Sequence, residues 1–366
     1  MPNMTDYLKW RGDITFSQNP FNDVDNIVLS YLAYTDFGNI VPGPGINDRI
    51  SLADAYDKFF SAYSREEIMS RKSSVKVAPF LMDDMVHANR YKDIYLTGYV
   101  DEVVVEEDSQ FSVTTFILPD NTYYVAFRGT DSTIVGWKED LNMGYLYQTL
   151  GQKKAMEYLN SNFSDIDCPL RVGGHSKGGN FAVYASAFCD YKIQDKIVNV
   201  YTNDGPGFRE DITLMSGYNR ILPKIRSIVP ENSIVGMLLL NSFEHKIVKS
   251  SNYGIQQHDA MSWQILGGDF ITCENLSERS IMIDEAVSNW IIGLNDEERK
   301  IFIDSLFQPL SDANIDTVDD LSEVSRSNLH RLREAFFGLS EEQHSALKGT
   351  AGKLLSSALD TLKSKK

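Results

Sequence analysis

The run GGHSKGG at residues 173–179 contains the residue best suited to chemistry, Ser176. Gly174 and Gly178 stand two positions before and after this serine, so the run fits the pattern G-x-S-x-G. A turn this tight, between a strand and a helix, leaves little room for neighbouring side chains, and both positions are best glycine. Apolar residues typical of a strand precede the run, and apolar residues at helical spacing follow it. We therefore predict that Ser176 is a nucleophile in acyl transfer.

A histidine must accompany the serine, because a hydroxyl is a poor nucleophile at neutral pH without an imidazole within hydrogen-bond reach. When such a turn carries a catalytic serine, its partners follow in the order serine, acid, histidine. The histidines after Ser176 are His245, His258, His330 and His344. We favour His258, which lies in the polar loop QQHD after the last predicted strand; His245, which opens a predicted strand, is the alternative. His330 and His344 are expected to be exposed to solvent on charged helices. His175 is expected to pack under the turn.

Two carboxylates could orient the imidazole, and the sequence leaves both open. Glu231 follows the predicted strand IRSIV and is preferred, because the acid usually follows the later strand in this topology. Asp204 follows the earlier strand KIVNVYT, and another interpretation makes it a turn former within NDGPG. The base is therefore expected to pair with Glu231 or with Asp204.

Backbone N–H groups are needed to stabilise the oxyanion that forms during acyl transfer. The first donor is expected to be the amide of Lys177, the residue after the nucleophile. The second is expected in the loop Arg128–Asp131, which follows the strand-like segment YYVAF. An edge hairpin that only caps the sheet would explain the same loop equally well.

The composition is that of an ordinary globular protein. Of 366 residues, 51 are acidic and 35 basic, and the formal net charge of −16 argues against binding to nucleic acid or an anionic membrane. Cys168, Cys189 and Cys273 match no metal-ligand spacing, so we expect reduced thiols, no metal and no cofactor. We find no signal-peptide pattern and no run of about 18 apolar residues, and expect a cytoplasmic protein without a transmembrane segment.

The order of predicted elements indicates an α/β fold. Up to about Asp93 the chain has helical periodicity, and these helices are expected to cover an edge of the sheet. From Ile94, three strands joined by short turns predict an antiparallel start to the sheet. After Thr130, helices and strands alternate, which calls for a mainly parallel sheet with helices on both faces. With a serine turn at a strand end, this order predicts the α/β-hydrolase fold.

The chain beyond Glu274 is expected to be helical. Apolar residues at helical spacing occur at 281–292, 300–307 and 321–332. Asn295 and Glu298 have the spacing of a capping box before the second of these segments. We therefore divide the chain into a hydrolase domain at residues 1–275 and a C-terminal helical extension at residues 276–366.

Two segments together resemble the class 3, fungal-type lipases. FRGTDSTIVGWKEDL, at residues 127–141, is similar to the FRGT-x-S…W-x-x-D-L stretch of these enzymes, and GGHSKGG is similar to their GHSLGG turn. The resemblance implies that Ser176 is the nucleophile and that Thr130 presents its amide, and its hydroxyl with it, to the oxyanion. It also places Trp137 and Asp140 where these lipases have a short lid helix.

The chain resembles the Mbeg1-like proteins, which are lipase-like α/β hydrolases, more closely still. The segments that carry this resemblance are DYLKWRGD, VDNIVLSYLAY, GHSKGGN, NDGPGF, ENSIVGMLL and QHDAMSW, spread over roughly residues 6–307. It implies the fold and a hydrolytic centre, and it does not name a substrate.

The sequence departs from the lipase pattern at two places. The lipases have leucine where Lys177 stands, so a cation is expected beside the nucleophile. Their Asp-x-Val-Pro acid motif is replaced here by ENSIV, which begins at Glu231. Glutamate can take the place of aspartate if its loop is set back by about one methylene, so activity is still expected.

We expect a serine hydrolase that cleaves carboxylic esters of lipids or other small acyl compounds through an acyl-Ser176 intermediate. Esterase, lipase, phospholipase and thioesterase activities all stay open, because a fold does not fix a substrate. The alternative function is that of a non-catalytic module of the same fold that binds a lipid or a protein partner. A serine peptidase is a third interpretation.

Overall fold

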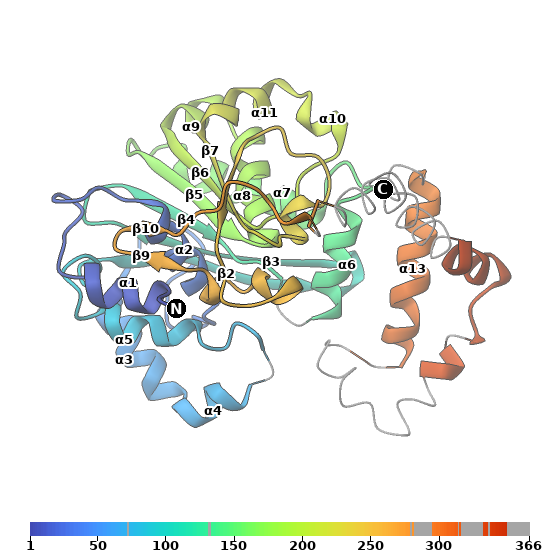
Figure 1. Cartoon of the computed structure of the whole chain (residues 1–366), viewed down its shortest axis with the longest axis horizontal. Helices are drawn as coiled ribbons and strands as arrows, with labels where there is room; N and C mark the ends of the chain where they lie inside the picture. Colours follow the sequence, from blue (N-terminus) through green and yellow to red (C-terminus); the bar gives the residue numbers. More distant parts are fainter. Residues whose placement is uncertain are drawn as a thin grey trace.

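The computed structural model describes residues 1–71, 73–130, 133–278, 280–281, 295–313, 315, 332–335 and 337–349. The strands of its main sheet are β1 (Ile50–Ser51), β2 (Tyr95–Val104), β3 (Ser109–Ile117), β4 (Tyr123–Phe127), β5 (Leu170–His175), β6 (Ile197–Asn203), β7 (Ile225–Pro230) and β8 (His245–Val248). They lie side by side in chain order (Figure 1). Neighbours are antiparallel from β1 to β4 and parallel from β4 to β8. The predicted α/β-hydrolase fold, with antiparallel strands first and parallel strands after, is confirmed.

Helices surround this sheet. They are α1 (Met4–Arg11), α2 (Asp23–Leu32), α3 (Leu52–Ala62), α4 (Arg65–Ser70), α5 (Leu81–Met85), α6 (Ile134–Asn142), α7 (Leu150–Phe163), α8 (Lys177–Phe188), α9 (Tyr191–Lys196), α10 (Glu210–Thr213), α11 (Ser216–Ile221) and α13 (Asp296–Asp312). A small hairpin of β9 (Ile265–Leu266) and β10 (Asp269–Phe270) lies outside the main sheet. Short 3-10 turns occupy Ala78–Phe80, Val105–Glu107, Leu222–Lys224, Val235–Met237, Gly254–His258 and Ala260–Ser262.

Both faces of the sheet are buried, and each has its own apolar core. Along β4, Tyr124 and Ala126 belong to one core, whereas Val125 and Phe127 belong to the other, because successive strand residues point to opposite faces. Helices α1, α2, α3 and α5 complete the first core, and α7 and α8 complete the second. Helices therefore cover both faces, as the sequence predicts.

The expectation that the N-terminal helices cover an edge of the sheet holds for α3, which contacts the edge strands β1 and β2, and is wrong for α2. Every residue of α2 from Val24 to Leu32 is buried, and this helix contacts β4 and β5 in the middle of the sheet. A helix at the surface buries only one apolar face, so a helix that is buried on all sides must be covered by other parts of the protein as well as by the sheet. The edge beside β2 is occupied instead by the two residues of β1.

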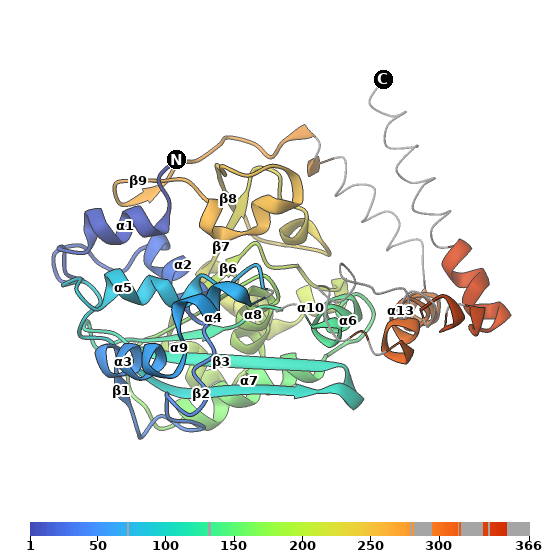
Figure 2. The same cartoon turned by 90° about the horizontal axis from the view of Figure 1, so that it is seen from below.

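Helix α13 lies beside α6, at one end of the sheet, in both Figure 1 and Figure 2. The predicted capping box is confirmed, since Asn295 Oδ1 accepts from the Glu298 amide at 2.9 Å and the Glu298 carboxylate accepts from the Asn295 amide at 2.9 Å. The predicted helices at 281–292 and 321–332 lie almost entirely outside the described residues. The domain division at residue 275 stays a prediction. A membrane span needs a run of about 18 apolar residues or more, and none of the helices in the described part of the chain meets this requirement.

Candidate active site

Ser176 is the single residue between the end of β5 and the start of α8. Its backbone has φ 58° and ψ −133°, a strained conformation that a serine keeps only when the surrounding structure holds it. Two backbone hydrogen bonds do so: the Ser176 amide donates to Asn203 O at 2.9 Å, and the Gly179 amide donates to Ser176 O at 2.9 Å. The predicted strand, tight turn and helix are confirmed.

The glycines of the turn are needed because the backbone passes too close for any Cβ. A Cβ on Gly174 would lie 2.3 Å from the Gly178 carbonyl carbon, and a Cβ on Gly178 would lie 2.0 Å from Phe127 O. These contacts pack the turn against the end of β4. Ser176 is therefore held next to the loop that follows β4.

The loops after β4, β5 and β6 converge on the serine. A Cβ on Gly129, two residues after β4, would lie 3.0 Å from the Ser176 Cβ. A Cβ on Gly205, two residues after β6, would lie 2.8 Å from Ser176 O. The carboxyl ends of neighbouring parallel strands meet at one sheet edge, which is where ligands bind in open α/β sheets.

His258 and Asp204 are paired at this same edge. His258 Nδ1 donates to Asp204 Oδ2 at 2.7 Å. Asp204 is fully buried, and its Oδ1 accepts from Ser233 Oγ at 2.5 Å and from the Gly236 amide at 3.1 Å. Because Nδ1 carries the proton, Nε2 of His258 is the basic nitrogen.

The His258 ring keeps a path to solvent and to substrate, with 26% of its side chain exposed. Within the described residues, no hydrogen bond joins its Nε2 to the hydroxyl of Ser176. In free hydrolases this contact is often long and shortens only when substrate binds.

Glu231, the preferred acid at the sequence level, does not contact His258. Its Oε2 accepts a hydrogen bond from Cys273 Sγ at 3.4 Å, and its backbone amide donates to Val248 O at 2.9 Å. The loop after β7 contributes to the site through Ser233 instead, whose hydroxyl donates a hydrogen bond to the Asp204 carboxylate. The carboxylate that the structure brings to the ring is Asp204.

The other histidines have different surroundings. His245 lies on β8, where its Nδ1 is 2.8 Å from Ser227 Oγ, and burial lowers its pKa. The His344 amide donates to Ser340 O at 2.9 Å within a C-terminal helical turn. His330 lies outside the described residues. Of the three candidates that the structure describes, His258 is the one whose ring is hydrogen-bonded to a carboxylate.

His175 packs against His258 and is hydrogen-bonded to its backbone. The His175 ring is 4.7 Å from the His258 ring, and its Nε2 donates to His258 O at 2.8 Å. Its Nδ1 lies 2.9 Å from the hydroxyl of Tyr34, a residue that follows α2. Burial lowers the pKa of His175 to about 3, so the ring is neutral, with its proton on Nε2. The expected position under the turn is observed, and the contact with His258 is new.

Thr130 is anchored to α6. Its Oγ1 donates to Asp140 Oδ2 at 2.7 Å. Burial raises the pKa of Asp140 to about 6, and the opposite charge of Lys177 and the Thr130 hydroxyl oppose this rise. Trp137, on the same helix, has 47% of its surface exposed. The residues that the lipase resemblance assigns to a lid helix therefore do lie on a helix beside Thr130.

Lys177 does not present its charge to the nucleophile, so that expectation is wrong. Its side chain is buried, and Nζ lies 3.0 Å from Glu139 Oε2 and 3.2 Å from Gln110 O. Lys177 is the first residue of α8, so its backbone amide directly follows Ser176.

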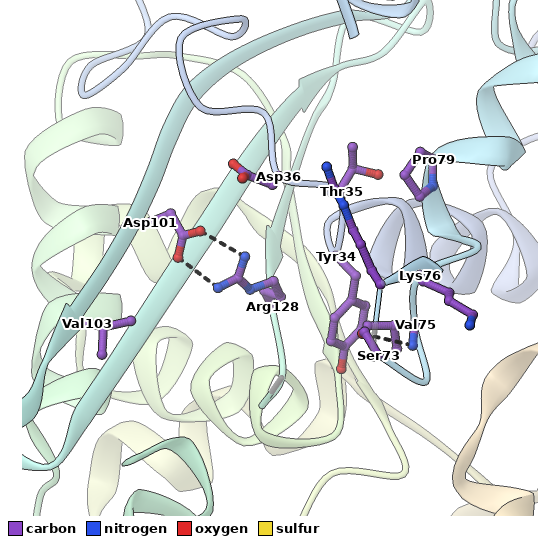
Figure 3. A pocket seen from close by; sticks show the side chains of 11 residues that line it. Tyr34, Thr35, Asp36, Ser73, Val75, Lys76, Pro79, Asp101, Val103 and Arg128 are labelled. Carbon is purple, nitrogen blue, oxygen red and sulfur yellow. Dashed lines mark hydrogen bonds and ion pairs between the residues drawn. The ribbon is translucent and has the colours of Figure 1, made fainter. Parts of the chain in front are cut away.

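A pocket of about 490 Å³, lined by both polar and apolar side chains, lies beside Arg128, the first residue after β4 (Figure 3). Its lining includes Tyr34, Lys76, Asp101 and Arg128, and Figure 3 shows Arg128 and Asp101 joined by two hydrogen bonds of 2.9 and 2.7 Å. Arg128 opens the loop predicted to supply an oxyanion donor, but the lining does not include Ser176, Thr130, Lys177, Asp204, Glu231 or His258. We therefore do not place the reaction there.

The topology and the serine turn define the class, a protein of the α/β-hydrolase fold. The sequence profile of the Mbeg1-like family matches residues 85–308, more than half of the chain, and the protein belongs to this family. The match includes every predicted site residue from Thr130 to His258.

Solved structures add a distant likeness. The crystal structure of M37 lipase matches with a TM-score of 0.37 and 13% sequence identity, over 59% of this chain and 70% of the lipase chain. No curated protein matches the chain.

Proposed function

We propose that the protein is a serine hydrolase that cleaves carboxylic esters of lipids or other acyl compounds. The observation that carries this proposal is the 2.7 Å hydrogen bond from His258 Nδ1 to Asp204 Oδ2, at the sheet edge where Ser176 stands on its strained turn. This arrangement supports the proposed roles of nucleophile for Ser176, base for His258 and orienting acid for Asp204.

In the proposed first half-reaction, Ser176 Oγ attacks the ester carbonyl carbon while His258 Nε2 takes the hydroxyl proton. The bond between the carbonyl carbon and the alcohol oxygen then breaks, and the alcohol leaves with the proton from His258. In the second half-reaction, His258 takes a proton from water and the water oxygen attacks the acyl carbon. The bond between that carbon and Ser176 Oγ then breaks, Ser176 Oγ takes the proton from His258, and the carboxylic acid leaves. Asp204 holds the imidazole in the tautomer that both steps require.

The oxyanion is proposed to receive hydrogen bonds from the amides of Lys177 and Thr130, with the Thr130 hydroxyl beside them. The close approach of Gly129 to Ser176 supports this role for the Thr130 loop. Each such donor contributes roughly 10²- to 10³-fold to kcat in serine hydrolases.

The test is hydrolysis of a panel of p-nitrophenyl esters of increasing acyl length. We expect Ser176→Ala to reduce kcat by about 10⁴-fold or more, and the matched variant Ser17→Ala, at an exposed serine, to keep full activity. A folded wild-type protein that hydrolyses none of the esters would instead favour the non-catalytic module. Turnover of p-nitroanilides at rates comparable with the esters would favour a peptidase.

A further inference from the structure

Two adjacent carboxylates of α6 each hold one of the two residues proposed to form the oxyanion hole. Glu139 Oε2 accepts from Lys177 Nζ at 3.0 Å, and Asp140 Oδ2 accepts from Thr130 Oγ1 at 2.7 Å. Lys177 begins α8, after β5, whereas Thr130 lies in the loop after β4. One turn of one helix therefore links the two halves of the proposed oxyanion hole.

The Glu139–Lys177 pair is deeply buried and fully hydrogen-bonded. Their side chains are 1% and 0% exposed. The Glu139 carboxylate also accepts from the amides of Gln110 at 3.0 Å and Gly151 at 2.9 Å, so it connects β3, the start of α7 and the start of α8. An ion pair of this kind costs desolvation that two apolar side chains would avoid, so its burial is weak evidence that it serves stability.

We propose that the buried Glu139–Lys177 ion pair positions the oxyanion hole by fixing the Lys177 amide relative to Thr130. Both are positioning residues, because neither side chain faces the serine. This inference rests on the proposed function and extends it to the residues that control the transition state.

The outer side of α6 is itself held in place. Lys138 Nζ, next to Glu139 in the chain, lies 2.8 Å from Asp108 and 3.1 Å from Asp304 of α13. Ile134 of α6 packs in a small apolar cluster with Phe307 of α13. Figure 2 shows α13 lying against α6 on the side away from the other helices of the hydrolase fold. The carboxylates therefore project from a helix that has contacts on both sides.

The test uses the full chain with three variants: Lys177→Met, Glu139→Gln and the double variant. Each single variant leaves one buried charge without its partner, and we expect both to lower the unfolding temperature. The double variant removes both members of the ion pair, and we expect its unfolding temperature to return toward that of the wild type. A loss of activity in the double variant can then be assigned to a displaced oxyanion hole and not to loss of folding.

For the double variant, we expect kcat on a p-nitrophenyl ester to fall about 10- to 100-fold while KM changes less than about two-fold. The affinity for a trifluoromethyl ketone, which forms an oxyanion on Ser176, should fall by the same factor as kcat. Lys154→Met, which breaks the exposed pair with Glu102, is the matched control and should keep wild-type kinetics.

A stable double variant with wild-type kcat would overturn the inference. A loss explained wholly by fewer titratable active sites, with unchanged kcat per site, would overturn it as well. If the wild type and Lys154→Met both lack ester hydrolysis, the proposed function itself fails, which separates that outcome from failure of the positioning role.

Discussion

At the residue scale, Asp204 has the turn conformation that one interpretation of the sequence expects, and its carboxylate contacts the imidazole of the proposed base. The sequence offers it as a turn former in NDGPG or as the acid of the base. In the structure it has φ 49°, a left-handed conformation that Asp tolerates in turns, and its carboxylate also accepts from His258. The sequence pattern alone could not choose between Asp204 and Glu231, because the choice depends on which loop bends toward the ring.

The two acids give a direct pair of variants. Asp204→Asn keeps the side-chain volume but loses the carboxylate that orients His258, and we expect kcat to fall by about 10⁴-fold. Glu231→Gln should lower kcat by less than about three-fold, because its carboxylate contacts Cys273 instead. Steady-state kinetics on one ester compares them. An equal loss in both variants would contradict the assignment of Asp204.

His175 predicts a pH dependence of stability. Its pKa is lowered to about 3 in the folded protein, from an ordinary value near 6.5 in the unfolded chain. Between these values the unfolded state binds the proton and the folded state does not, so its contribution is complete above pH about 6.5 and is lost as pH falls.

Thermal unfolding at several pH values tests this titration. We expect the unfolding temperature of the wild type to fall more steeply below pH about 6.5 than that of His175→Asn. Identical pH profiles for the two proteins would show that His175 does not titrate in this way.

At the scale of elements, the sequence predicts long strands and helices well and their short connections poorly. The alternating apolar pattern locates β2 to β8, and the capping box locates the start of α13. The two-residue strands β1, β9 and β10 carry too few residues for a pattern. Some hydrogen-bond partners come from distant elements, such as Tyr34 for His175 and Ser233 for Asp204. Their spacing along the sequence does not predict them, because tertiary packing alone brings them together.

The loop between β4 and α6 provides a prediction at this scale. A Cβ on Gly129 would lie 2.2 Å from the Tyr34 hydroxyl and 2.5 Å from His175 O. We expect Gly129→Ala to destabilise the protein by about 1–3 kcal/mol and to reduce kcat/KM by about 10²-fold, because the serine and the oxyanion loop are pushed apart. Gly349→Ala, where the added Cβ meets nothing within 4 Å, is the control for chemical denaturation and kinetics. Full activity in Gly129→Ala would contradict the proposed packing.

At the scale of the whole molecule, the first 84 residues lie outside the match to the family profile yet supply much of one core. Arg90 ties them together, since its guanidinium donates to Asp25 at 2.7 and 2.5 Å and to Asn19 O at 2.9 Å. Both side chains of this ion pair are at most 1% exposed. The N-terminal segment is therefore part of the same folded unit as the sheet.

We expect Arg90→Met to lower the free energy of unfolding by about 3–5 kcal/mol, because it leaves the Asp25 carboxylate buried without its cation. Arg65→Met breaks the ion pair with Asp83, whose side chains are 49% and 33% exposed, and should cost less than about 1 kcal/mol. Urea unfolding compares the two. Similar small losses would mean that the N-terminal segment contributes little to global stability.

The central claim is that Ser176 is a nucleophile activated by His258. The most direct measurement is reaction of the folded protein with a fluorophosphonate, followed by peptide mapping of the modified residue. We predict rapid modification of Ser176, loss of modification in Ser176→Ala, and a large decrease in rate for His258→Ala, because the base no longer takes the serine proton. Absence of modification in the folded wild-type protein, or modification that persists in Ser176→Ala, would contradict this account.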